Sequence, residues 1–159
     1  MLEVDPARRD LCSRLGAISI NPSIAPVPDQ VRDIFGSAAD SAIDAVGNSA
    51  SMNDALNSIA FGGVVTLVGM ASPELNLPSY RISTEEREMV GSFCYSNGDF
   101  SHAASWVNSG PPVLSALISR AVGLEQANDA FCQLAAGDGT AGKVVVHVQD
   151  DLGLNFGGE

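Results

Sequence analysis

Five short apolar runs, separated by stretches with helical spacing, constrain the fold of this chain more than any other feature. The runs occupy residues 17–20, 41–46, 63–68, 89–93 and 143–148. Their apolar residues do not alternate regularly with polar ones, which is typical of strands buried on both faces. Strands of this kind, each separated from the next by a helix, form a parallel sheet covered by helices. The sequence therefore predicts an α/β fold.

The segments between these runs carry the signals of α-helices. Residues 7–15 are preceded by a proline and followed by a glycine, the residues expected at the two ends of a helix. Apolar residues recur at helical spacing from Met52 to Ala60, after two serines, either of which could cap the helix. We expect a further helix to begin at Asp99 and another to cover residues 124–134.

Charge and cysteine usage limit the partners and the compartment. Eight Lys and Arg against nineteen Asp and Glu give a net charge of -11, which disfavours nucleic acid and anionic membrane surfaces. The longest nearly apolar run, residues 59–71, is too short to span a bilayer, and the residues after Met1 do not resemble a secretory signal. Cys12, Cys94 and Cys132 are an odd number at wide spacings, which suits neither a disulfide framework nor a zinc cluster. We therefore expect a cytoplasmic protein.

The segment from Gly137 to Lys143 matches two phosphate-loop patterns, GxGxxG and GxxxxGK, as strings of letters. A phosphate-binding loop needs a strand before its glycines and a helix after them, because the amides of the helix N-terminus bind the anion. Here the predicted order is reversed, and Val144 stands where Ser or Thr is usual. We interpret the segment as a turn from a helix to a strand.

Two carboxylates near the start of the chain, Glu3 and Asp5, are candidates for a nucleotide-binding role. An acidic residue at the carboxyl end of the second strand of a dinucleotide-binding sheet accepts hydrogen bonds from the adenosine ribose and repels the extra phosphate of NADP. A carboxylate just before a helix is also a common capping or dipole-balancing device. The residues alone leave both interpretations open.

Six stretches of the chain follow one another in a distinctive order: EVDPARRDLCSRLGA at 3–17, ADSAIDAVG at 39–47, FGGVVTLVG at 61–69, EMVGSFCY at 88–95, LEQANDAF at 124–131 and AGKVVV at 141–146. This succession resembles the medium-chain dehydrogenase/reductase superfamily, and most closely its zinc-dependent alcohol and polyol dehydrogenase branch. The resemblance implies a partial Rossmann-type fold, a doubly wound parallel sheet lacking its first strand, with a C-terminal helix and strand segment after it.

The resemblance also implies which residues contact a cofactor. Glu3, thirteen residues before Gly16, suits the ribose-binding position better than Asp5, which makes NAD the expected cofactor, and Arg8 would lie beside the adenosine. The other implied contacts lie against the dinucleotide, the nicotinamide carboxamide or the pyrophosphate: Val46, Gly47, Val68, Gly69, Met70, Ser92, Phe93, Cys94 and Lys143.

Simpler interpretations exist for several of these residues. Val46, Val68 and Phe93 could be core residues at strand ends. Cys94 could be a small buried side chain, and Lys143 could extend from a strand edge into water without binding anything.

The chain departs from the family pattern at its beginning. The N-terminal catalytic domain with its zinc ligands and the first strand with its glycine-rich turn have no counterpart here, so Met1 falls within the second strand. We expect residues 1–95 to be a partial NAD-binding domain and residues 96–159 to be a segment that returns to the absent catalytic domain. The missing strand should leave a vacancy between the strands at Leu2 and Ile43.

The resemblance implies that the intact parent transfers hydride between NAD and a small alcohol or polyol, with zinc ligands supplied from outside this chain. We expect no catalytic or metal-binding residue within the chain, which should be inactive alone. Two alternatives are a non-catalytic nucleotide-binding or interaction module and part of a zinc-free quinone reductase of the same superfamily. Family members pair through the strand at residues 89–93, so a homodimer or homotetramer is expected.

Overall fold

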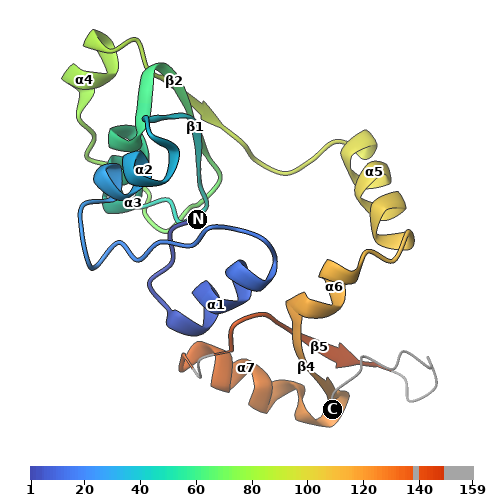
Figure 1. Ribbon diagram of the computed structural model, residues 1–159. Helices are drawn as coiled ribbons and strands as arrows, with labels where there is room; N and C mark the ends of the chain where they lie inside the picture. Colours follow the sequence, from blue (N-terminus) through green and yellow to red (C-terminus); the bar gives the residue numbers. More distant parts are fainter. Residues whose placement is uncertain (138–139, 149–159) are drawn as a thin grey trace. The chain divides into compact units, whose positions relative to one another are not determined.

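The computed structural model describes residues 1–137 and 140–148. The chain divides into two compact units (Figure 1). One unit is Pro22–Ser96, and the other combines Met1–Asn21 with the described part of Asn97–Glu159. The predicted division into domains at residue 96 stays a prediction.

The unit Pro22–Ser96 is a three-stranded parallel sheet with helices between its strands. Its elements are α2 (Val27–Phe35), β1 (Ala39–Asp44), α3 (Ser49–Ser58), β2 (Ile59–Leu67), α4 (Ser79–Thr84) and β3 (Glu88–Gly91). The strand order is β1-β2-β3, with Ile43 opposite Thr66 and Thr66 opposite Val90. The predicted runs at 41–46, 63–68 and 89–93 are thus strands, but β1 and β3 end two residues early.

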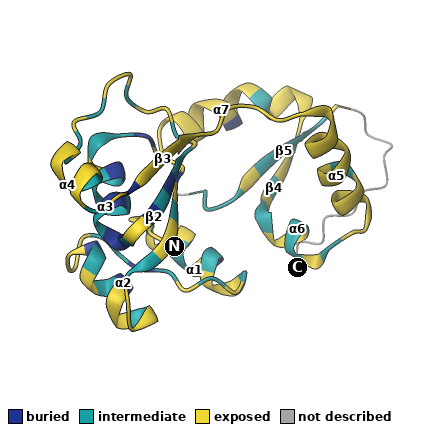
Figure 2. Ribbon diagram, turned by 90° about the horizontal axis from the view of Figure 1, so that it is seen from above, coloured by how far each residue is buried: buried dark blue, intermediate teal, exposed yellow. Residues whose placement is uncertain are grey.

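The core of this unit lies between α3 and the sheet. Met52 and Leu56 of α3 pack with Ile59 and Val65 of β2, and all four are almost completely buried (Figure 2). Burying a side chain of this size contributes about 1.5–3 kcal/mol. The helical spacing that begins at Met52 therefore correctly places Met52 and Leu56 on the buried face of α3. It is wrong at Ile59 and Ala60, which lie in β2, so this strand begins four residues before the predicted run at 63–68.

The cap of α3 differs from the prediction. Asn48, not a serine, is the N-cap: its side chain accepts a hydrogen bond from the Ser51 amide, and the Ser51 hydroxyl accepts one from the Asn48 amide. The prediction of a serine cap was therefore wrong. Serine and asparagine side chains both accept hydrogen bonds from the amides of the first turn, and only the path of the backbone decides which residue precedes that turn.

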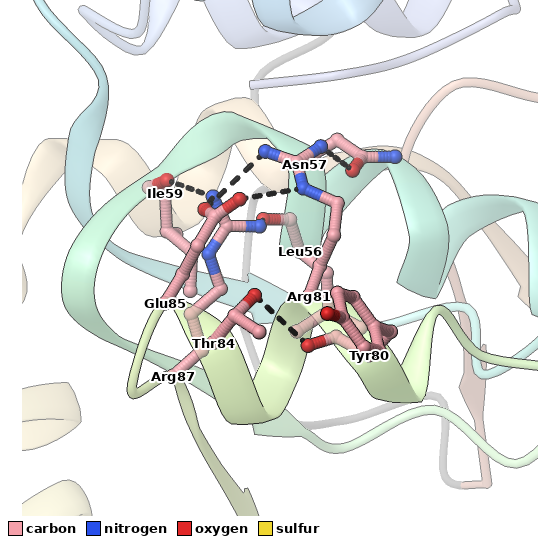
Figure 3. A network of polar contacts seen from close by, with 8 residues as sticks. All are labelled: Leu56, Asn57, Ile59, Tyr80, Arg81, Thr84, Glu85 and Arg87. Carbon is pink, nitrogen blue, oxygen red and sulfur yellow. Dashed lines mark hydrogen bonds and ion pairs between the residues drawn. The ribbon is translucent and has the colours of Figure 1, made fainter.

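An arginine network closes the other end of α3 (Figure 3). The Arg87 guanidinium is buried and donates to the main-chain oxygens of Leu56 and Ile59, the latter at 3.0 Å. Glu85 pairs with Arg87 and with Arg81, whose Nε lies 2.8 Å from the Glu85 carboxylate. The network ties the C-terminal end of α3 to the segment between α4 and β3.

The other unit contains two short regions of regular structure near the start of the chain. α1 (Pro6–Arg14) begins at proline and is followed closely by Gly16, as predicted, and Asp5 is its N-cap. The strand predicted at residues 17–20 is wrong except at Ile20, which forms an isolated parallel bridge with Leu2. The Ile20 amide donates to the Met1 oxygen and the Glu3 amide donates to the Ile20 oxygen, and the chain enters α1 at Pro6.

The rest of this unit runs α5 (Asn97–Asn108), α6 (Pro112–Leu117), β4 (Ile118–Gly123), a 3-10 turn η1 (Leu124–Gln126), α7 (Ala127–Ala135) and β5 (Lys143–His147). β4 and β5 form a two-stranded parallel sheet. The helix α7 comes before residues 137–143 and β5 begins at Lys143, which is the reverse of a phosphate loop; residues 138 and 139 lie outside the described residues.

The α/β prediction is confirmed, since all the strand pairs in the described residues are parallel and helices separate the strands. Four elements, α2, α4, α6 and β4, were not predicted from the sequence. β4 was missed because Arg120 interrupts its apolar residues, although Ile118, Arg120 and Val122 share its more buried face.

Candidate functional site

Two loops meet where β1 and β2 end. Both strands are parallel, so their carboxyl ends lie at the same edge of the sheet, the edge at which open α/β sheets bind ligands. The loop after β1 contains Val46 and Gly47, and the loop after β2 contains Val68, Gly69 and Met70. The fold therefore brings five of the predicted cofactor contacts together.

The two loops touch through their backbones. A Cβ added to Gly47 would lie 2.1 Å from the Gly69 carbonyl carbon, and one added to Gly69 would lie 2.1 Å from the carbonyl carbon of Val46. Gly47 also has φ +77°, a conformation that strains residues with a side chain. Only glycine at both positions permits this approach.

Backbone hydrogen bonds hold the two loops together. The Ala71 amide donates to the Val46 oxygen at 3.1 Å, and the Ser72 amide donates to the Gly47 oxygen at 2.9 Å. These bonds continue the pairing of β1 and β2 beyond the ends of the two strands.

Asp44, the last residue of β1, lies beneath these loops and is 4% exposed. Its Oδ1 accepts hydrogen bonds from the amides of Val46 (2.8 Å) and Gly47 (3.1 Å), and its Oδ2 accepts one from the Ser51 hydroxyl (3.0 Å). Asp44 is a site residue that the sequence pattern does not single out. The available signal was a carboxylate within the predicted strand 41–46, three residues before the loop glycine Gly47.

The apolar side chains of these loops face solvent. Val46 is 51% exposed, Val68 45% and Met70 74%. The interpretation of Val46, Val68 and Phe93 as core residues is therefore wrong, since Phe93 is 78% exposed as well. Residues at this strand edge are free to contact a ligand because no element of their own unit buries them.

The third group of predicted cofactor contacts, residues 92–94, follows β3. The Ser92 amide donates to the Leu67 oxygen at 2.9 Å, so Ser92 continues the pairing with β2. Phe93 and Cys94 lie beyond the strand rather than in it, and Cys94 is exposed, contrary to its interpretation as a small buried residue. The Cys94 backbone has φ +59°, which is uncommon for a residue other than glycine.

The remaining predicted contacts, Glu3, Arg8 and Lys143, belong to the other compact unit. The Glu3 carboxylate accepts a hydrogen bond from the Asp5 amide at 2.9 Å, while the Asp5 carboxylate accepts one from the Arg8 amide at 2.9 Å. Asp5 thus acts as a helix cap, the simpler of its two interpretations. Lys143 is the exposed first residue of β5. The cofactor roles of these residues stay predictions.

Two further findings concern the described residues, 1–137 and 140–148. They contain no group of three or more His, Cys, Asp or Glu side chains that could hold a metal ion. None of their helices combines the length and the apolar character that crossing a bilayer requires.

Comparison with known proteins shows which family model and which proteins the chain matches. A family model described as zinc-binding dehydrogenase matches residues 1–109. A probable D-xylulose reductase A from Aspergillus niger is 31% identical over 144 residues, which are 87% of this chain and 40% of the relative. The chain thus spans about two fifths of the length of this relative.

Solved structures agree on the fold. A 2R,3R-butanediol dehydrogenase from Bacillus subtilis superposes with a TM-score of 0.82 at 21% identity, covering 93% of this chain and 43% of that one. A short chain alcohol dehydrogenase from Escherichia coli CFT073, complexed with the cofactor NADH, gives 0.79 at 19% identity, with 92% and 43% covered.

Proposed function

The chain belongs to the zinc-binding dehydrogenase family, and from this premise we propose that it is the NAD-binding C-terminal part of an alcohol or polyol dehydrogenase that works in the cytoplasm. The relatives support the substrate class, because they include a probable D-xylulose reductase and a butanediol dehydrogenase. The proposed partners of the whole enzyme are a small alcohol or polyol and NAD.

The observation that carries the proposal is the close approach of Gly47 and Gly69 at the carboxyl ends of β1 and β2. Side chains at these two positions would fill the space in which the loops meet, and the outward side chains of Val46, Val68 and Met70 are exposed around it. Such an edge fits a flat, partly apolar ligand such as the nicotinamide half of NAD.

Each predicted contact has its own task in this proposal. Backbone groups of the stretches 68–70 and 92–94 would orient the carboxamide, and Val46 and Val68 would exclude water from one face of the ring. Glu3 would accept hydrogen bonds from the adenosine ribose, while Arg8 and Lys143 would lie near the adenosine and the pyrophosphate. Bound NAD⁺ supplies a carbon that takes hydride from the alcohol.

Zinc does not fit the described residues of this chain, which hold no cluster of metal-ligating side chains. The zinc that the family name implies would be held by other parts of the whole enzyme. No step that this chain performs depends on it.

The test is to express the longest protein encoded by the reading frame that contains this chain. We expect it to oxidise NADH in the presence of D-xylulose or a related ketose, and to contain zinc. A zinc-free enzyme that oxidises NADH with a quinone but not with a ketose would favour the quinone reductase alternative. A longer protein that lacks both the activity and NAD binding would refute the proposal.

Thermal melting of the 159-residue chain, with and without NAD, tests the non-catalytic alternative. That alternative predicts cooperative melting and a higher melting temperature in NAD. The dehydrogenase proposal predicts no change, because the chain carries only part of the expected contacts.

We also propose that the enzyme is a homodimer or homotetramer paired through β3. β3 is bonded to β2 on one side, and all four of its residues are exposed. Pairing of this strand with its symmetry mate would satisfy the open backbone groups.

A further inference from the structure

We infer that Asp44 is a positioning residue of the cofactor site, whose carboxylate fixes the two loops that receive the nicotinamide half of NAD. The inference rests on the proposed function and deepens it, because it adds the group that gives the site its shape. Asp44 itself touches no cofactor in this arrangement and acts through Val46 and Gly47.

Asp44 holds both loops at once. Its carboxylate binds the amides of Val46 and Gly47, and its main-chain oxygen accepts hydrogen bonds from the amides of Val68 and Gly69, each at 2.9 Å. A single residue therefore determines the path of the chain after β1 and anchors the chain after β2. Loss of the carboxylate would remove the bonds that fix the turn after β1, while the main-chain bonds between the two loops would remain.

The Asp44 carboxylate is not needed to start α3. The capping box of that helix consists of Asn48 and Ser51, and the Ser51 amide donates to Asn48 rather than to Asp44. The Ser51 hydroxyl donates to Asp44 in addition. A carboxylate that only supported the start of α3 would need the Ser51 hydroxyl as its partner but not the amides of Val46 and Gly47.

Burying a carboxylate is costly unless donors surround it. Here three donors converge on one carboxylate that is 4% exposed, and hydrogen bonds to a charged acceptor are stronger than neutral ones. This buried polar group lies beneath loops whose own side chains face solvent. Surface loops are ordinarily free to move, so a loop fixed in this way suits a preformed binding surface.

The main variants are Asp44→Ala, Asp44→Asn and Asp40→Ala. Alanine leaves the Val46 amide, the Gly47 amide and the Ser51 hydroxyl without their acceptor. Asparagine keeps one side-chain oxygen for the two amides, and its NH₂ group can donate to Ser51. Asp40 is the matched control, because it lies on the same strand but is exposed.

The first measurement is hydrogen exchange of the intact enzyme without added cofactor. In Asp44→Ala the Val46 and Gly47 amides should exchange at least about tenfold faster, the equivalent of one lost hydrogen bond to a charged group, while Val65 keeps its protection. Unchanged exchange at both loop amides would overturn the inference. If Asp44→Ala does not fold, Asp44→Asn replaces it: its neutral amide oxygen is a weaker acceptor, so both loop amides should still exchange faster than in Asp40→Ala, and equal exchange would overturn the inference.

The second measurement is the titration of NADH and of ADP-ribose, which lacks nicotinamide, into the intact enzyme. Asp44→Ala should weaken NADH binding about tenfold and leave ADP-ribose binding within about twofold, while Asp44→Asn and Asp40→Ala stay near wild type. A merely structural role would weaken both ligands equally, which would refute the positioning role. Failure of the wild-type enzyme to bind NADH would instead refute the proposed function, and the exchange data would still decide whether Asp44 fixes the loop.

Discussion

Replacing Gly47 with alanine tests whether the close approach of the two loops is essential. The added Cβ would lie 2.1 Å from the Gly69 carbonyl carbon, 2.1 Å from its oxygen and 2.5 Å from the Met70 amide nitrogen. Every one of these atoms is backbone, so no side chain can rotate away. The loops must separate by at least about 1.3 Å to restore a normal van der Waals contact.

Two costs contribute to the expected loss of stability. Alanine at a positive φ costs about 1–2 kcal/mol. Separating the loops also breaks the bonds from Ala71 to Val46 and from Ser72 to Gly47, each worth about 0.5–1.5 kcal/mol. We therefore expect Gly47→Ala to lower the free energy of unfolding by about 2–5 kcal/mol.

Gly62→Ala is the matched control. Gly62 has φ +69° and no atom within 4 Å of the Cβ position, so it incurs only the conformational cost of about 1–2 kcal/mol. Urea unfolding followed by circular dichroism measures both variants, and the slope of about 1–3 kcal/mol per molar urea makes the difference visible as a shift of the midpoint. Equal destabilisation by the two substitutions would show that the contact between the loops contributes nothing to stability, contrary to this prediction.

Three more substitutions test other parts of the structure. Leu56→Ala removes a completely buried core side chain and should lower the free energy of unfolding in urea by about 2–5 kcal/mol. The control Leu124→Ala, at an exposed position, should lower it by less than about 0.5 kcal/mol, and similar losses in the two variants would contradict the assigned core. Glu85→Gln removes a carboxylate whose pKa is held below its ordinary value by a hydrogen bond from Arg81 and by the charge of Arg87. Because the pKa is lowered on folding, Glu85 stabilises the protein above about pH 4.5 and loses this contribution as the pH falls through its lowered pKa. The difference between wild type and variant should therefore be full at pH 7 and shrink as the solution is acidified below pH 4.5. In the whole enzyme, Val90→Asp on the open edge of β3 should give a smaller mass in light scattering, and an unchanged mass would contradict pairing through this strand.

The carboxyl-end loops show how far the sequence predicts the site. The runs at 41–46 and 63–68 indicate strands, and a loop directly after each strand places Gly47 and Gly69 at the same edge. The sequence does not reveal that these two glycines touch, because contact depends on the register of β1 against β2. Register is set by pairing across the sheet and is not encoded in either strand alone.

Polar residues were the least predictable. Asp44 resembles any aspartate at a strand end, and Arg87 resembles any charged residue in a loop. Asp44 is buried because three donors from its own turn and from α3 surround it, and Arg87 because Glu85 and two main-chain oxygens do. Composition and periodicity do not reveal these hydrogen-bond partners, because the partners come from residues that only folding brings together.

The amino-acid sequence by itself determined the α/β class, the buried face of α3 and the order of the segments, because these follow from local periodicity and from the backbone preferences of single residues. The tertiary structure decided where β1 and β3 end, which residue caps α3, and which carboxylate lies beneath the loops. These features depend on hydrogen bonds and packing distances between segments that are far apart in the sequence. The order of residues along the chain does not reveal those contacts.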